Sequence, residues 1–133
     1  MHLTPHDVGV SAHLGSYSDA IEVAPNVRWL VTAGTPGFAS DGTLPSDFAA
    51  QASSAWDNVK RLLEDAGFAL SDLVKVTTSV TNVSDIAAYQ DIRRHALGDL
   101  KPAFMLAVVT QLIDPRILIE VEVWAAKPAG SAN

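Results

Sequence analysis

The sequence predicts an α+β domain in which two helices pack on one face of a single mixed β-sheet. Three observations lead to this prediction of the fold class. Two segments repeat apolar residues at helical spacing, and several short segments alternate apolar and polar residues as strands do. The predicted order is two strands, a helix, a strand, a helix and two strands. The length of 133 residues, with 48% hydrophobic and 18% charged content, suits one globular domain over residues 1–133.

The first strands are expected at Ser18–Val23 and Val27–Gly34, joined by a short turn around Pro25–Asn26. The dozen residues before them could form an edge strand or a loose arm. Residues 35–45, TPGFASDGTLP, are rich in Gly, Pro, Ser and Asp and therefore predict a loop.

The first helix is expected over Ser46–Ala66, where apolar residues fall on one face of a 3.6-residue period. These residues are Phe48, Ala52, Ala55, Trp56, Val59, Leu62, Leu63 and Ala66. Ser46 is a suitable N-cap, and Gly67 is suited to end the helix.

A second helix is expected at about Asp85–Leu97, capped by Ser84 and ended by Gly98. The pair Arg93–Arg94 falls on this helix, and we interpret it as part of a solvated face.

The remaining strands are expected at Leu73–Asn82, Phe104–Leu112 and Ile117–Ala126. The first alternates β-branched and polar residues as a half-buried strand does. The sheet face opposite the helices is neither covered nor fully polar. We therefore expect a homo-oligomer to close over it.

Two acids, Glu120 and Glu122, lie two residues apart in the last strand and so share one of its faces. The other face is wholly apolar, with Ile117, Ile119, Val121 and Val123. Acids in such positions are either solvated or line a site. Burial of both would raise the pKa of one of them.

The segments LGSYSDAIEV, LVTAGTPG, LEDAGFALSDLVKVTTSVTNVSDIAAY and KPAFMLAVVTQL…ILIEVEVWA occur in an order and spacing that resemble the RidA (YjgF, reactive intermediate deaminase) family over nearly the whole chain. The resemblance implies a chorismate mutase-like fold, a homotrimer whose sheets pack into a barrel, and ligand clefts between subunits. It also implies hydrolysis of enamines or imines to 2-keto acids and ammonia. No cofactor is expected.

The family site uses a Tyr in a YSxA segment, a Gly after the second strand, an Arg after a Pro-x pair and a Glu in the last strand. Tyr17, Gly34 and Glu120 match, and Thr35 adds a hydroxyl beside the Gly. By this resemblance Glu120 would hold and polarise a water, and Tyr17 would bond to the substrate. The alternative for Glu120 is a solvated strand acid or an interface ion-pair partner, and the alternative for Tyr17 is packing in a subunit interface. We interpret Glu122 as structural or interfacial.

Phe104 occupies the position of the family Arg and cannot clamp a carboxylate through two hydrogen bonds. Losing such a clamp costs about 2–5 kcal/mol, so imines of simple amino acids should be poor substrates. Leu106, on the same strand face, makes the expected pocket more apolar, which would suit an aminomuconate-type substrate. Arg116, in a turn that is longer than usual for the family, could reach the cleft mouth or be solvated.

Composition excludes several classes of function. The net charge of −6, the pI of about 4.9 and the lack of a basic patch argue against nucleic-acid partners and an endoribonuclease role. No cysteine, metal-binding spacing, signal peptide or membrane-spanning run occurs, so we expect a cytoplasmic protein with no metal and no membrane partner. A trimer that binds a small molecule without catalysis is the alternative to a deaminase.

Overall fold

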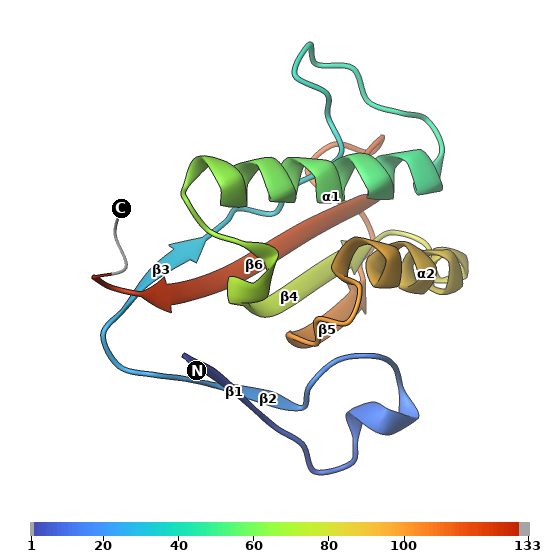
Figure 1. Cartoon of the computed structure of the whole chain (residues 1–133). Coiled ribbons are helices and arrows are strands. Elements are labelled where there is room, and N and C mark those ends of the chain that lie inside the picture. Colours follow the sequence, from blue (N-terminus) through green and yellow to red (C-terminus); the bar gives the residue numbers. More distant parts are fainter. Residues whose placement is uncertain (1, 131–133) are drawn as a thin grey trace.

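The computed structural model describes residues 2–130 and confirms the α+β fold class (Figure 1). Its main elements are β1 Leu3–His6, β2 Ala20–Val23, β3 Val27–Val31, α1 Phe48–Asp65, β4 Leu73–Val80, α2 Ile86–Leu97, β5 Ala103–Val108 and β6 Ile119–Pro128. Short 3-10 helices follow β1 and precede β4 and α2; they are η1 Ser11–His13, η2 Leu70–Asp72 and η3 Val83–Asp85. Both predicted helices are therefore present.

The main sheet has the strand order β3-β6-β4-β5. β4 and β5 run parallel, whereas β6 is antiparallel to both of its neighbours. α1 and α2 lie on one face of this sheet, and within residues 2–130 no α-helix covers the other face (Figure 1). The sheet is mixed, as the sequence predicts.

The prediction of a single sheet is wrong for the first predicted strand, Ser18–Val23, whereas the second joins the main sheet as β3. β2 pairs with β1 rather than joining the main sheet, and the two form a separate two-stranded ribbon. Pro25 has no N–H to donate and Asn26 has a φ of 60°, so the chain turns away before β3 begins. Ser18 ties the ribbon to the start of β5, because its N–H donates to the Pro102 carbonyl and its hydroxyl to the Lys101 carbonyl, at 3.3 and 2.6 Å.

The helix ends differ from the predicted caps in two places. Asp47, not Ser46, caps α1, and its carboxylate accepts a hydrogen bond from the Ala50 N–H at 2.7 Å. Before α2 the chain forms η3, where the Asn82 side chain accepts from the Ser84 N–H. Both helices end before a glycine with positive φ, as predicted from Gly67 and Gly98.

The core lies between α1, α2 and the covered face of β4 and β6. It includes Ala52, Ala55, Trp56, Val59, Leu63, Val76, Val80, Tyr89, Leu97, Ile119, Val121 and Val123. The alternate residues of β4 and β6 point to the other side, which we call the open face. Glu120 and Glu122 lie there, as do Trp29 and Val31 of β3, which are 50% and 58% exposed.

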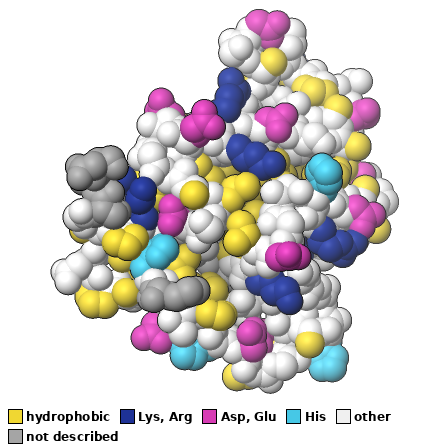
Figure 2. All heavy atoms as spheres, in the orientation of Figure 1, with side chains coloured by type: hydrophobic (Ala, Val, Ile, Leu, Met, Phe, Trp, Pro, Cys, Tyr) yellow, Lys and Arg dark blue, Asp and Glu magenta, His cyan; other side chains and the backbone are white. Residues whose placement is uncertain are grey.

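Figure 2 shows Lys and Arg side chains dispersed singly among acidic ones on the side that it depicts. Within residues 2–130 the helices are too short or too polar to cross a membrane.

Candidate functional site

Glu120 occupies the open face of β6. Its neighbours Ile119 and Val121 are buried on the helix side, and its partner on β4 is Ser79. Burial, and after it the negative charge of Glu122, raises the pKa of Glu120 above its ordinary value of 4.5. A carboxylate with a raised pKa is a stronger base when it is ionised.

Gly34 lies beside Glu120 at a bulge in the chain that follows β3. The N–H groups of Thr32 and Thr35 donate to β6 carbonyls that are only two residues apart, at 3.1 and 2.9 Å, so the β3 side accommodates an extra residue. A side chain at Gly34 would approach the Glu120 carboxylate to less than 3.0 Å. The glycine therefore leaves the space that this carboxylate occupies.

Tyr17 and Phe104 meet at the other edge of the sheet, with ring centroids 5.7 Å apart. Phe104 pairs in register with a fully buried residue of β4, so its ring faces the helices, where it stacks on Tyr89 at 6.4 Å. Leu106 faces the same way and packs against the core. Within one chain, Phe104 and Leu106 are thus on the opposite side of the sheet from Glu120.

The Arg93 guanidinium lies over the Phe104 ring, 4.0 Å from its centroid. Nη1 donates to the Ser16 carbonyl at 3.1 Å, while Nε and Nη2 donate to Gln90 Oε1 at 3.3 and 3.1 Å. The residue is only 1% exposed, and its burial lowers the pKa of the guanidinium.

The expectation that Arg93 and Arg94 share a solvated face is therefore wrong for Arg93. Only Arg94 is exposed, and it pairs with Asp91 on the same helix. Helical spacing could have found this, because Arg93 lies four residues from both Tyr89 and Leu97, which form the buried stripe of α2.

Arg116 lies apart from both groups. Its guanidinium forms an ion pair with Asp114, with Nη2 2.8 Å from Oδ2, and the hydrogen bonds of Arg116 hold the pKa of Asp114 down to about 2. It borders a groove of about 310 Å³ that is also lined by Leu44, Pro45, Ser46, Pro115 and Leu118. Neither Glu120 nor Phe104 lines that groove.

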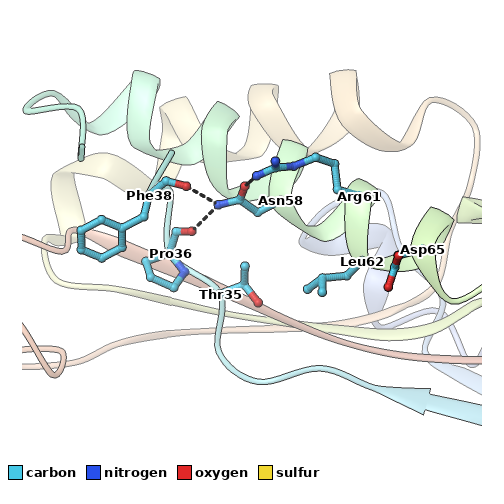
Figure 3. A pocket seen from close by; sticks show the side chains of 7 residues that line it. All are labelled: Thr35, Pro36, Phe38, Asn58, Arg61, Leu62 and Asp65. Carbon is cyan, nitrogen blue, oxygen red and sulfur yellow. Dashed lines mark hydrogen bonds between the residues drawn. The ribbon is translucent and has the colours of Figure 1, made fainter. Parts of the chain in front are cut away.

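A groove of about 530 Å³ separates α1 from the segment after β3 (Figure 3). Asn58 fixes one wall, because its side-chain amide donates to the carbonyls of Pro36 and Phe38, at 2.9 Å each. Thr35 is the predicted site residue that lines this groove. Over residues 2–130, no three His, Asp or Glu side chains gather as metal ligands would.

The sequence matches the profile of the family described as Endoribonuclease L-PSP over residues 10–127. A RutC family protein of Pyrococcus abyssi is 33% identical over 116 residues, which cover 86% of this chain and 88% of that protein. A 2-iminobutanoate/2-iminopropanoate deaminase of Escherichia coli is 35% identical over 77 residues, or 57% of this chain and 58% of the enzyme.

Solved structures show the same fold. A protein of unknown function from the conserved Rid family of Yersinia pestis superposes with a TM-score of 0.84 at 28% identity, covering 96% of this chain and 100% of that one. RidA from an Antarctic Psychrobacter species has a TM-score of 0.70 at 30% identity, with 92% of each chain covered.

Proposed function

Because this chain belongs to the RidA (YjgF) family, we propose that it hydrolyses a small enamine or imine to a carbonyl compound and ammonia. The deaminase named among its relatives supports the reaction class. The observation that carries the proposal is the half-buried Glu120 carboxylate, which lies on the open face against a glycine and has a raised pKa.

In the proposed reaction, Glu120 accepts a proton from a water as the water oxygen bonds to the C=N carbon. Glu120 then passes this proton to the nitrogen, and the hydroxyl proton of the tetrahedral carbon follows it as the C–N bond breaks, so the nitrogen leaves as ammonia and Glu120 is again ionised. The carbon keeps the oxygen as a carbonyl, so one water is consumed for each ammonia released. Tyr17 would hydrogen-bond the substrate from the other part of the site.

Since Glu120 and Tyr17 belong to groups on different sides of the sheet, the proposed site is completed between subunits. The exposed Trp29 and Val31 on the open face support closure by further copies of the chain. We propose a homotrimer with clefts in which Glu120 of one subunit faces the Tyr17–Phe104 edge of the next. Light scattering should give three times the chain mass, and a monomer at micromolar concentration would contradict this assembly.

The activity is tested in a coupled assay. An amino-acid oxidase generates an imine, and the rate of keto-acid release is compared with and without the protein. Acceleration that the Glu120→Gln variant loses would support the proposal. The same assay with enamines of aromatic catabolites tests the aminomuconate-type alternative.

A trimer that binds a small molecule without catalysis is the second candidate. Phe104 favours it, because the position that carries the family Arg has no charge. Thermal stabilisation by 2-keto acids without any acceleration of imine hydrolysis would identify this function. An endoribonuclease role finds no support in the acidic charge of −6.

A further inference from the structure

Arg93 is a buried cation. Among residues 2–130, no Asp or Glu lies within 4.0 Å of its guanidinium. Its acceptors are a backbone carbonyl and the neutral Gln90 amide, and its hydrogen bonds use three of the five N–H groups that an arginine carries. Burying a charge without a counter-ion is costly, so this arrangement would be completed by an anion.

A second donor points to the same place. The position at which a side chain of Gly15 would begin is 3.5 Å from Arg93 Nη2, 3.6 Å from Gln90 Nε2 and 3.7 Å from the Tyr17 ring. Gln90 Oε1 accepts from Arg93, so the Nε2 donors of this amide face Gly15. The cation and the amide thus both lie against Gly15, beside the tyrosine that the sequence predicts to contact substrate.

We propose that Arg93 binds the carboxylate of the substrate, in the role that the sequence shows Phe104 cannot fill. This inference rests on the proposed function and specifies its substrate class as a carboxylate-bearing imine or keto acid. The anchoring cation then comes from α2 rather than from β5. Gln90 donates the accompanying hydrogen bond.

The Phe104 ring has a definite part in this arrangement. It lies under the guanidinium, where its π face attracts the cation without occupying the N–H groups in the guanidinium plane, two of which remain for a further acceptor. The irregular segment 15–17 contacts Arg93 through the Ser16 carbonyl. A carboxylate oxygen would take the place of that carbonyl and bind more strongly, since hydrogen bonds between ionised groups are stronger than those to neutral acceptors.

The test compares a carboxylate with its neutral counterpart. Calorimetry measures the binding of 2-oxobutanoate and of its methyl ester to the wild-type protein and to Arg93→Gln. The wild type should prefer the carboxylate, and the variant should lose about 10- to 100-fold of its affinity for 2-oxobutanoate while affinity for the ester stays the same. A wild type without this preference, or a folded variant that keeps it, would overturn the inference.

Arg94→Gln is the matched control. Arg94 is the next residue in the chain and carries the same charge, but its side chain is exposed. It should leave both affinities unchanged. If Arg93→Gln does not fold, Arg93→Lys keeps the charge but not the planar fork, and the carboxylate preference should still fall. A folded Arg93→Lys that keeps the full preference would contradict the role proposed for the guanidinium.

A measurement on the unaltered protein separates binding from mere structural support. In NMR spectra with assigned arginine side chains, 2-oxobutanoate should shift the Arg93 Nε–H signal and the ester should not. A signal that stays fixed at saturation would return Arg93 to a role in holding Ser16.

The outcomes also separate this inference from the proposed function. Imine hydrolysis without any carboxylate preference would sustain the deaminase and refute the role of Arg93. Arg93-dependent carboxylate binding without hydrolysis would sustain the role of Arg93 and refute the deaminase.

Discussion

The two parts of the candidate site differ in charge and in burial. On the open face, Glu120 and Glu122 place two negative charges side by side, and burial raises the pKa of Glu120. The other part lies at the β5 edge of the sheet, on the side that the helices cover, and we call it the helix edge. There Arg93 places one positive charge over Phe104, and burial lowers the pKa of the guanidinium. Among residues 2–130, no oppositely charged side chain forms an ion pair with either part.

This difference indicates that the two parts have different tasks. A carboxylate with a raised pKa suits proton transfer, whereas a guanidinium held by hydrogen bonds suits the binding of an anion. Since the two lie on opposite sides of one sheet, a single chain does not combine them. The comparison therefore predicts that changes on the open face reduce turnover, while changes at the helix edge alter which ligands bind.

The largest effect is expected for Glu120→Gln, which keeps the shape of the side chain and removes the proposed base. Turnover should fall by about 10²–10⁴-fold, while light scattering shows an unchanged assembly. A variant with full turnover would exclude Glu120 as the base. A variant that loses the assembly would instead assign the carboxylate to the interface.

Gly34→Ala and Gly37→Ala form a matched pair, in which the first should lose turnover and the second should lose stability. The atoms nearest to a new methyl group at 34 belong to the Glu120 side chain, and the tightest contact is with its movable carboxylate. The fold should therefore persist while displacement of the carboxylate lowers turnover by up to about 100-fold. At 37 it meets the backbone carbonyl of Gln51 in α1, so stability should fall by about 1–3 kcal/mol. Chemical denaturation and the coupled assay measure both effects.

Equal losses of stability in these two variants would contradict the assignment. Gly34 would then be a residue of the fold rather than one that leaves room for a reactive carboxylate.

Glu122→Gln should have a smaller effect, on pH dependence. Because the charge of Glu122 contributes to the raised pKa of Glu120, its removal should move the acid limb of the kcat/KM profile to lower pH. The limb should remain above 4.5, since burial is the larger cause and is unchanged. A limb that does not move would show that the two carboxylates do not interact.

The smallest effect concerns stability. The pKa of Glu120 is higher in the folded chain than in the unfolded chain. At a pH between the unfolded and the folded pKa, the folded state therefore binds more protons than the unfolded state. The free energy of unfolding consequently falls as the pH rises from the unfolded pKa through the folded pKa. Glu120→Gln removes this loss and should therefore be slightly more stable than wild type near pH 7, but not below about pH 4. Thermal unfolding at both pH values checks the sign.

Much of the fold could be predicted from the sequence because the deciding patterns are local. The helical spacing of Trp56, Val59 and Leu63 identifies the buried face of α1, and the alternation around Glu120 identifies the open face of β6. A strand or helix has a fixed period, so the face of each residue follows from its neighbours in the chain. Gly34 and Glu120 could likewise be singled out by resemblance.

The tertiary structure alone decided which of these faces meet. β1 and β2 leave the main sheet, Phe104 faces the helices rather than Glu120, and Arg93 lies buried over the Phe104 ring. These features depend on partners distant in the chain, such as the Ser16 carbonyl, 77 residues from Arg93. Local periodicity assigns a residue to a face, but its charge environment is set by what packs on that face, which only the folded chain determines.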